Sequence, residues 1–270
     1  MTSDHGLLIA RERTRVAKLA GEEIARVLSP LDMSPDAYEY ALAQRGPQRV
    51  PFLSTLWCPD PEIKDVLNRG IALHCLGIEL MDDLLDRDTG LEMGDLSIGA
   101  YLIQSGTSLL CTVGNPLAVH STLERHYQNI WRYQLRELRC RPSTFEEWLE
   151  VARVKSGQVL VCYTEVVCHA SDIQPDPKIH DDYAEALGTL IMVRDDFKDY
   201  QETGELTGNI VRLLRERRTS VETVAALIDE LREQGQSALR RSKLDAGFDW
   251  FATFAEDAHK RLGLINDGEP

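Results

Sequence analysis

The stretch IALHCLGIELMDDLLDRD (Ile71–Asp88) joins a long apolar run to four aspartates, at Asp82, Asp83, Asp86 and Asp88. In a helix, like charges one turn apart repel one another, and acids near a helix C-terminus oppose the helix dipole. Such a cluster therefore needs a compensating cation, unless its carboxylates simply face water. A solvated face is the usual explanation for one acidic run, so a second feature has to decide between the two.

A second stretch, EALGTLIMVRDDFKDY (Glu185–Tyr200), repeats the pattern, with Asp195, Asp196 and Asp199 at the same spacing after another apolar run. In each copy the first and last aspartates are four residues apart, so they project from one side of a helix. The group Asp181-Asp182-x-x-Glu185 has a similar spacing, but it lies in the first turn of a helix, where acids favour the dipole, and is interpreted as structural. We expect the two matched motifs to lie at one end of a shared apolar interior.

Clustered carboxylate oxygens suit Mg²⁺, which binds through one or two carboxylates, keeps water and completes its shell with phosphate oxygens. The residues predicted to bind the metal are Asp82, Asp83, Asp86, Asp195, Asp196 and Asp199. A ligand held by Mg²⁺ next to an apolar interior would be polyanionic at one end and apolar at the other. A prenyl diphosphate has both properties.

Apolar residues recur at helical spacing through almost the whole chain, and the alternation typical of strands is nearly absent. The expected fold is all-α, a single domain over residues 1–270 in which long helices form a bundle around a central apolar cavity. Helix start signals include a capping box of Ser143 with Glu146. The expected helices lie near residues 5–28, 35–44, 61–87, 96–112, 117–139, 144–171, 178–201, 207–217, 220–242 and 248–263.

The composition excludes several classes of function. A net charge of -14 argues against nucleic acid or an anionic membrane surface as a partner, since clustered Lys and Arg hold both. No apolar run is long enough to span a membrane, and six scattered cysteines indicate free thiols in a reducing compartment. We therefore expect a cytoplasmic protein with no nucleic-acid partner and no stable membrane insertion.

The two motifs resemble those of the trans-isoprenyl diphosphate synthase family, all-α proteins with two DDxxD motifs on facing helices. The likeness spans about residues 40–205 and includes VKSGQVL, in which Lys155 stands where the family has a lysine for the allylic diphosphate. The resemblance implies that Asp82, Asp83, Asp86, Asp195 and Asp199 hold three Mg²⁺ ions with the bound diphosphate, with Asp196 nearby. It also implies that Lys155 and Arg49 contact diphosphate and that the protein is a homodimer.

The sequence departs from the family where its second substrate, isopentenyl diphosphate, binds. The GGKR element of the family aligns with Gly46-Pro47-Gln48-Arg49, which keeps one arginine and loses the lysine. Its RRG element aligns with Glu92-Met93-Gly94, and this exchange removes two phosphate-binding arginines and adds an acid. The departures favour a class I terpene synthase, which ionises a C15 or C20 prenyl diphosphate and cyclises or quenches the cation.

Positions one and two turns before the first motif limit product chain length in the family. They correspond here to His74, Cys75, Gly77 and Ile78. Gly77 with Ile78 leaves moderate room, which is compatible with a C15 or C20 chain.

Two alternatives stay open. One is a prenyltransferase that joins the allylic diphosphate to isopentenyl diphosphate or to another acceptor. The other is a non-catalytic partner subunit of an active synthase.

Overall fold

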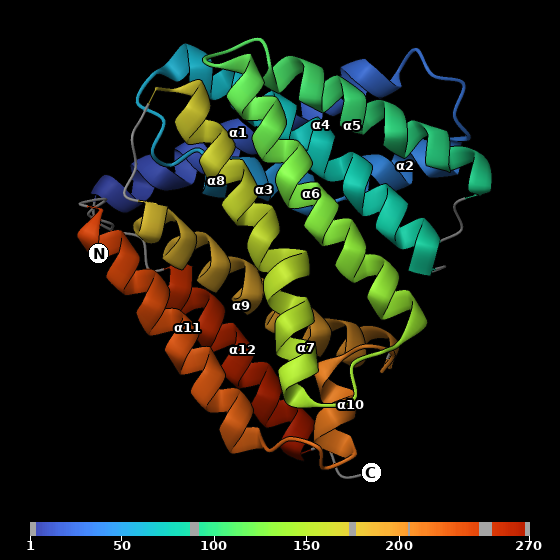
Figure 1. The fold of residues 1–270 in the computed structure, drawn as a ribbon, viewed down its shortest axis with the longest axis vertical. Helices are drawn as coiled ribbons and strands as arrows, with labels where there is room; N and C mark the ends of the chain where they lie inside the picture. Colours follow the sequence, from blue (N-terminus) through green and yellow to red (C-terminus); the bar gives the residue numbers. More distant parts are fainter. Residues whose placement is uncertain (1–3, 87–91, 173–176, 205, 243–249, 268–270) are drawn as a thin grey trace. The chain divides into compact units, whose positions relative to one another are not determined.

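The computed structural model describes residues 4–86, 92–172, 177–204, 206–242 and 250–267. These residues form helices and turns and contain no strand (Figure 1), so the prediction of an all-α fold is confirmed. By their internal contacts the residues group into two compact units, Met1–Glu124 with Tyr163–Gln174 and Arg125–Cys162 with Pro175–Pro270. The single domain and the central cavity stay predictions.

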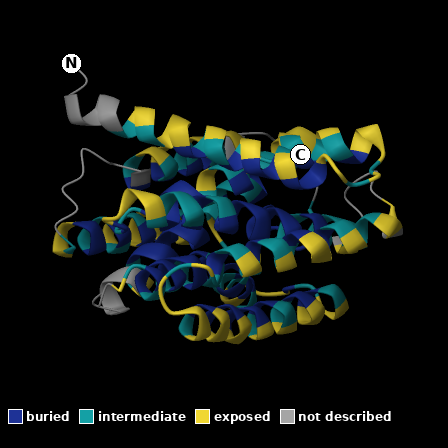
Figure 2. Cartoon of the chain, turned by 90° about the horizontal axis from the view of Figure 1, so that it is seen from above, coloured by how far each residue is buried: buried dark blue, intermediate teal, exposed yellow. Residues whose placement is uncertain are grey.

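The first unit is built around α4. Its elements are α1 (Asp4–Leu28), α2 (Pro35–Ala43), α3 (Gly46–Ser54), α4 (Pro61–Asp86), the 3-10 turn η1 (Met93–Asp95), α5 (Leu96–Leu110), the first part of α6 (Pro116–Arg139) and the last part of α8 (Gln158–Ala170). Helix α4 packs against α1, α3 and α5. Its buried residues Leu73, Leu76 and Leu80 form a core with Ile24 of α1, while the outer faces of the helices are exposed (Figure 2).

Helices α4 and α5 approach each other at backbone distance because glycines face one another. An added side-chain carbon at Gly77 would lie 2.6 Å from the carbonyl oxygen of Gly99, and one at Gly106 would lie 2.7 Å from the carbonyl oxygen of Gly70. No real side chain fits at such distances in a close-packed interior. The glycines are seven residues apart in both helices, so the close contact repeats every two turns.

The second unit is built around α9. Its elements are the rest of α6, α7 (Phe145–Ala152), the π-helical turn η2 (Arg153–Gly157), the start of α8, α9 (Pro177–Thr203), α10 (Ile210–Arg215), α11 (Val221–Arg241) and α12 (Trp250–Asp267). Helix α9 packs against α11, α12 and η2. Its residues Leu187, Leu190 and Val193 are fully buried, which explains the apolar run before the second motif.

Two segments differ from the helices expected from the sequence. Residues 46–54 were not expected to be helical, yet they form α3 with Pro51 in its interior. The single helix expected over residues 144–171 is divided by η2. An added carbon at Gly188 of α9 would lie 2.3 Å from the carbonyl oxygen of Ser156, so η2 and α9 are in backbone contact.

The capping box expected at the start of the 144–171 segment is displaced by one residue. Instead of Ser143 with Glu146, the pair is Thr144 with Glu147. The hydroxyl oxygen of Thr144 accepts a hydrogen bond from the backbone nitrogen of Glu147 at 3.2 Å. The carboxylate of Glu147 in return accepts one from the backbone nitrogen of Ser143 at 2.7 Å.

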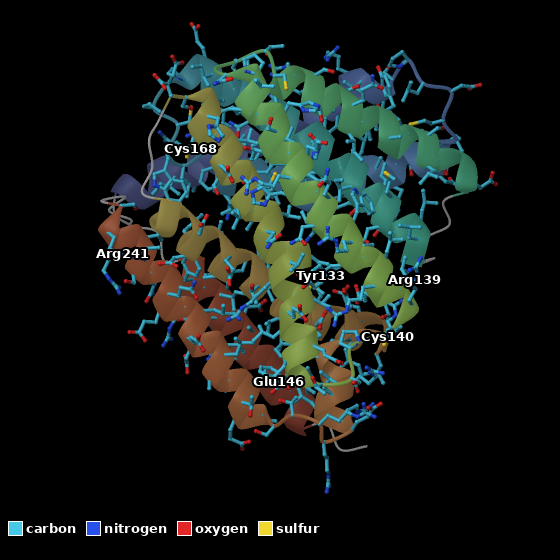
Figure 3. The ribbon with its side chains drawn as sticks, in the orientation of Figure 1. Tyr133, Arg139, Cys140, Glu146, Cys168 and Arg241 are labelled. Atoms are coloured by element: carbon cyan, nitrogen blue, oxygen red, sulfur yellow. The ribbon has the colours of Figure 1, made fainter. Side chains whose placement is uncertain are left out.

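All six cysteines are free thiols, and their exposure varies. Cys140 is exposed just after α6, whereas Cys168 is buried on α8 (Figure 3). Burial raises the pKa of the Cys168 thiol to about 12, so this thiol stays protonated.

Within the described ranges, no helix combines the length and apolar character needed to cross a membrane.

Candidate active site

The first aspartate motif occupies the last turns of α4. Asp82 and Asp83 are partly exposed there, and the helix ends at Asp86, whose side chain lies outside the described residues, as does Asp88. The hydroxyl group of Tyr40 on α2 donates a hydrogen bond to Asp83 Oδ2 at 2.6 Å. Burial and the bond to Asp83 raise the pKa of Tyr40, so the phenol remains a donor and orients this carboxylate.

The turn before the motif lies against the start of α3. An added carbon at Gly46 would lie 2.0 Å from Glu79 Oε1, and the same oxygen is 3.7 Å from the sulfur of Cys75. Burial and the charge of Glu79 raise the pKa of the Cys75 thiol, which therefore stays protonated and donates to the carboxylate. Arg49, the predicted diphosphate-binding residue of this segment, is exposed one turn into α3.

The four residues predicted to limit chain length lie in different surroundings on α4. Gly77 faces α5, whose backbone fills the space that a side chain would need. His74 is 2 % exposed, and its Nδ1 lies 3.0 Å from the hydroxyl oxygen of Tyr163. Burial lowers the pKa of His74 to about 4, so the ring is neutral near pH 7. Cys75 is buried and Ile78 is partly exposed; a role for these residues in chain length stays a prediction.

The second motif presents its first and last aspartates to solvent. Asp195 is partly exposed and Asp199 is exposed on α9. Nη2 of Arg194 lies 2.9 Å from Asp195 Oδ1, and the same guanidinium group stacks 4.8 Å from the centre of the Phe254 ring on α12. A cation therefore already compensates Asp195 within this unit.

Asp196 has a different environment from its two neighbours in the motif. Its side chain is 7 % exposed, and its Oδ2 accepts hydrogen bonds from Trp148 Nε1 at 3.0 Å and from the backbone nitrogen of Ile210 at 2.7 Å. Burial raises the pKa of Asp196 to about 8, although both hydrogen bonds act to lower it. Protein donors thus already bond to Oδ2 of this buried carboxyl group, which sets Asp196 apart from the two accessible aspartates of the motif. The metal-binding role predicted for Asp196 stays a prediction.

Lys155 forms an ion pair inside the second unit. Its Nζ lies 2.9 Å from Glu137 Oε2, and the two side chains are only 13 % and 5 % exposed. Lys155 belongs to η2, and irregular π turns of this kind are often found at functional sites. Glu137 is on α6 and also pairs with Arg141 at 3.5 Å. An anionic ligand that bonds to Lys155 would have to compete with Glu137.

Glu137 and its neighbour Gln134 were not anticipated from the sequence. Both are buried on one face of α6, one turn apart. Gln134 is 2 % exposed, and within the described part of the chain neither its amide oxygen nor its amide nitrogen has a hydrogen-bond partner. A buried amide of this kind is costly unless a ligand or water satisfies it. Polar residues three apart on the inner face of an amphipathic helix were the signal that could have found them.

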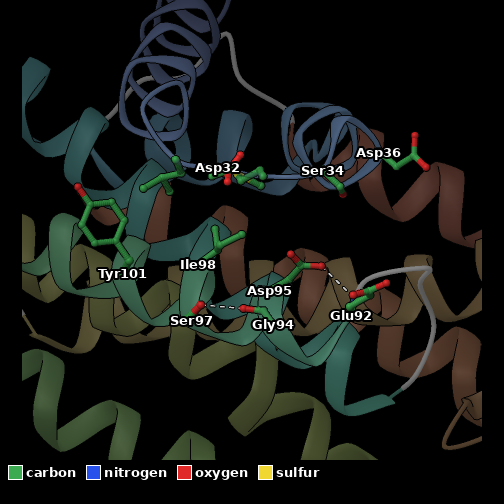
Figure 4. Close-up of a pocket in the computed structure, with 11 residues that line it drawn as sticks. Asp32, Ser34, Asp36, Glu92, Gly94, Asp95, Ser97, Ile98 and Tyr101 are labelled. Carbon is green, nitrogen blue, oxygen red and sulfur yellow. Dashed lines mark hydrogen bonds between the residues drawn. The ribbon is translucent and has the colours of Figure 1, made fainter.

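A groove of about 630 Å³ opens in the first unit, between the segment after α1 and the start of α5 (Figure 4). Four acids contribute to its lining, Asp32, Asp36, Glu92 and Asp95. Glu92 and Gly94 belong to the segment that aligns with the RRG element of the family. These four acids give the groove a negative lining, which disfavours an anion that carries no metal ion with it.

The residues of the two motifs suit Mg²⁺. No group of three or more His, Cys, Asp or Glu side chains that could hold an ion is found among the residues with described positions. Mg²⁺ does not need such a cage, because one or two carboxylates, water and phosphate oxygens complete its shell. The accessible carboxylates of Asp82, Asp83, Asp195 and Asp199 supply ligands of this type.

No protein-family model and no curated protein matches the sequence. Solved structures, in contrast, match it over nearly its whole length. A geranyltransferase from Legionella pneumophila aligns with a TM-score of 0.68 at 15% identity, over 97% of this chain and 99% of that one. A geranylgeranyl pyrophosphate synthetase from the archaeon Geoglobus acetivorans aligns with a TM-score of 0.64 at 17% identity, over 98% and 100%.

A third match is a polyprenyl synthase from Caulobacter crescentus CB15, solved in complex with calcium and isoprenyl diphosphate. It has a TM-score of 0.58 at 15% identity and covers 98% of this chain and 92% of that one. The chain therefore has the all-α isoprenoid synthase fold, as the resemblance in its sequence implied.

Proposed function

We propose that the protein is a divergent member of the trans-isoprenyl diphosphate synthase family that binds an allylic prenyl diphosphate with Mg²⁺ and ionises it. The observation that carries this proposal is the pair of matched aspartate motifs on α4 and α9, with carboxylates accessible in both. The isoprenoid synthase fold supports it, because the solved structures of this fold include prenyl diphosphate synthases.

In this proposal the polar residues bind the diphosphate and the apolar helices surround the prenyl chain. Mg²⁺, when bound, would neutralise the diphosphate and so favour its departure from the allylic carbon. The metal ligands would be Asp82, Asp83, Asp86, Asp195 and Asp199. Lys155 would donate a charge-assisted hydrogen bond to a diphosphate oxygen.

Tyr40 and Gln134 would assist binding in different ways. Tyr40 holds the carboxylate of Asp83 in one orientation through its 2.6 Å hydrogen bond. The buried amide of Gln134 has both a donor and an acceptor available for a polar group of the ligand or for water.

We further propose that the enzyme is a class I terpene synthase, in which the prenyl cation of a C15 or C20 substrate is cyclised or quenched by water. The acidic lining of the groove supports the terpene synthase, since Glu92 and Gly94 of this lining align with the element in which the family has two arginines for the second diphosphate. Chain elongation is the second candidate, and the fold shared with a geranyltransferase and a geranylgeranyl pyrophosphate synthetase supports it.

Product analysis tests both candidates. Purified protein is incubated with Mg²⁺ and geranyl, farnesyl or geranylgeranyl diphosphate, each with and without isopentenyl diphosphate, and the extract is analysed by mass spectrometry. A hydrocarbon or alcohol formed without isopentenyl diphosphate supports the terpene synthase. A longer diphosphate formed only with it establishes chain elongation. No Mg²⁺-dependent turnover under any condition would leave the non-catalytic subunit as the better explanation.

The homodimer implied by the resemblance is part of the same proposal. Light scattering on the purified chain measures its mass directly. A mass equal to one chain, 30.5 kDa, would contradict this part of the proposal alone.

A further inference from the structure

Asp196 connects three elements of the second unit. Its Oδ2 accepts hydrogen bonds from Trp148 on α7 and from the backbone nitrogen of Ile210, the first residue of α10. Its backbone oxygen accepts a third, from Asn209 Nδ2 at 2.6 Å. Asn209 also caps α10, because its Oδ1 accepts from the backbone nitrogen of Val211 at 2.7 Å. Asp196 thus bonds the start of α10 to α9.

The turn that Asp196 fixes lies against the partner of Lys155. Gly208 directly precedes Asn209 and has a φ of 73°, and an added carbon at Gly208 would lie 2.9 Å from Glu137 Oε1. The other carboxylate oxygen of Glu137 is the one that bonds to Lys155 Nζ at 2.9 Å. Asp196, the turn at residues 208–210, Glu137 and the ammonium group of Lys155 are therefore successive neighbours.

We propose that Asp196 is a positioning residue and not a metal ligand: it fixes the turn at residues 208–210 and, through Glu137, the ammonium group of Lys155 relative to Asp195 and Asp199. The role rests on the proposed function, which assigns the two flanking aspartates to the metal and Lys155 to the diphosphate. Displacement of one binding group by even a small distance weakens a site whose groups act together. Asp196 thus sets the geometry of diphosphate binding without touching the ligand.

The first test compares two neighbouring aspartates by calorimetric titration of the protein with inorganic diphosphate in the presence of Mg²⁺. Asp196→Asn keeps an oxygen that can accept both side-chain hydrogen bonds, so its Kd should stay within about threefold of the wild type. Asp195→Asn removes a charged metal ligand and should raise the Kd by about 10- to 100-fold. If Asp196→Asn raises the Kd as much as Asp195→Asn, Asp196 is a ligand and the proposal is wrong.

The second test asks whether the turn at residues 208–210 affects diphosphate binding through Glu137, and it compares two matched glycines. Gly208 and Gly204 have φ values of 73° and 76°, so alanine introduces the same backbone strain at both. Only the first replacement meets Glu137; at Gly204, no described atom lies within 4 Å of the added carbon. Gly208→Ala should raise the diphosphate Kd by about fivefold or more and Gly204→Ala by less than about twofold. Equal effects of the two replacements on the Kd would contradict the claim that the turn positions Lys155 through Glu137.

A wild-type protein that binds no diphosphate with Mg²⁺ would show that the proposed function is wrong. Hydrogen exchange then tests separately whether Asp196 fixes the turn at residues 208–210. The amide of Ile210 donates to Asp196, so it should be protected in the wild type and in Asp196→Asn. In Asp196→Ala the acceptor is lost and exchange at Ile210 should become faster. Unchanged protection in Asp196→Ala would overturn the anchoring role independently of any ligand.

Discussion

Lys155 and Glu137 pair at 2.9 Å in surroundings that leave both side chains almost inaccessible to water. Removing two charges from water costs several kcal/mol, and their mutual attraction compensates only while both partners are present. The pair therefore has two separable roles. It satisfies two charges inside the second unit, and it holds the ammonium group that we assign to the diphosphate.

Replacing Lys155 separates these roles. Lys155→Met should lower the free energy of unfolding by about 3 kcal/mol, because the carboxylate of Glu137 loses its nearer cation. The same variant should raise the KM for the prenyl diphosphate by about 10- to 100-fold, through loss of a charge-assisted hydrogen bond. The double variant Lys155→Met, Glu137→Met should recover much of the stability and none of the affinity. Recovery of both would contradict the role of Lys155 in binding.

Tyr40→Phe tests the orientation of the first motif. The variant removes only the hydroxyl group that donates to Asp83 at 2.6 Å. We expect the Mg²⁺ concentration for half-maximal activity to rise by about tenfold, as is usual when a group supporting a metal ligand is lost. Tyr38→Phe on the same helix is the matched control and should leave the Mg²⁺ dependence unchanged. Equal Mg²⁺ dependence of the two variants would show that Tyr40 does not orient a ligand.

His74 should make the protein sensitive to acid. Its pKa is about 4 in the folded state and near 6.5 in the unfolded chain, so below pH 6.5 the unfolded state binds the proton first. The free energy of unfolding should therefore fall by about 3 kcal/mol from this residue alone as the pH is lowered from 7 to 4. His74→Gln removes this contribution, so urea unfolding across the same range should show a shallower pH dependence. An unchanged slope would contradict the burial of a neutral ring.

Gly77→Ala tests whether this glycine packs against α5 or lines a cavity. The added carbon would lie 2.6 Å from the carbonyl oxygen of Gly99, so we expect a loss of about 3 kcal/mol in the free energy of unfolding. Gly21→Ala in α1 is the control: no described atom lies within 4 Å of its added carbon, and the helix should gain up to about 1 kcal/mol. If the Gly77→Ala protein has unchanged stability and forms a shorter product, Gly77 lines the cavity and does not pack against α5.

The helix that carries the first motif could be predicted almost to the residue, 61–87 against Pro61–Asp86, because a proline start and a regular apolar period determine it locally. Helix α3 could not, since Pro51 in its interior argues against a helix and only packing on α1 and α4 overrides it. The π turn at Arg153–Gly157 likewise accompanies the close approach of α9 at Gly188, a contact with a distant segment.

The same distinction applies to the candidate site. The spacing of the motif predicts that Asp195 and Asp199 project from one side of a helix, because spacing is a property of the helix alone. It says nothing of Asp196, whose surroundings come from Trp148, 48 residues earlier, and from Ile210, 14 residues later. Gln134 and Glu137 were missed for a related reason, since their burial depends on what packs against α6.

The most direct test of the central claim measures inorganic diphosphate released from farnesyl and geranylgeranyl diphosphate by the wild type and by Asp82→Ala, with Mg²⁺ and with a chelator. We predict release by the wild type only with Mg²⁺ and none by Asp82→Ala. Without metal, that variant should melt at the same temperature as the wild type or higher, because repulsion within the motif is relieved. Undiminished release by a folded Asp82→Ala protein, or no release by the wild type from either substrate, would contradict the account.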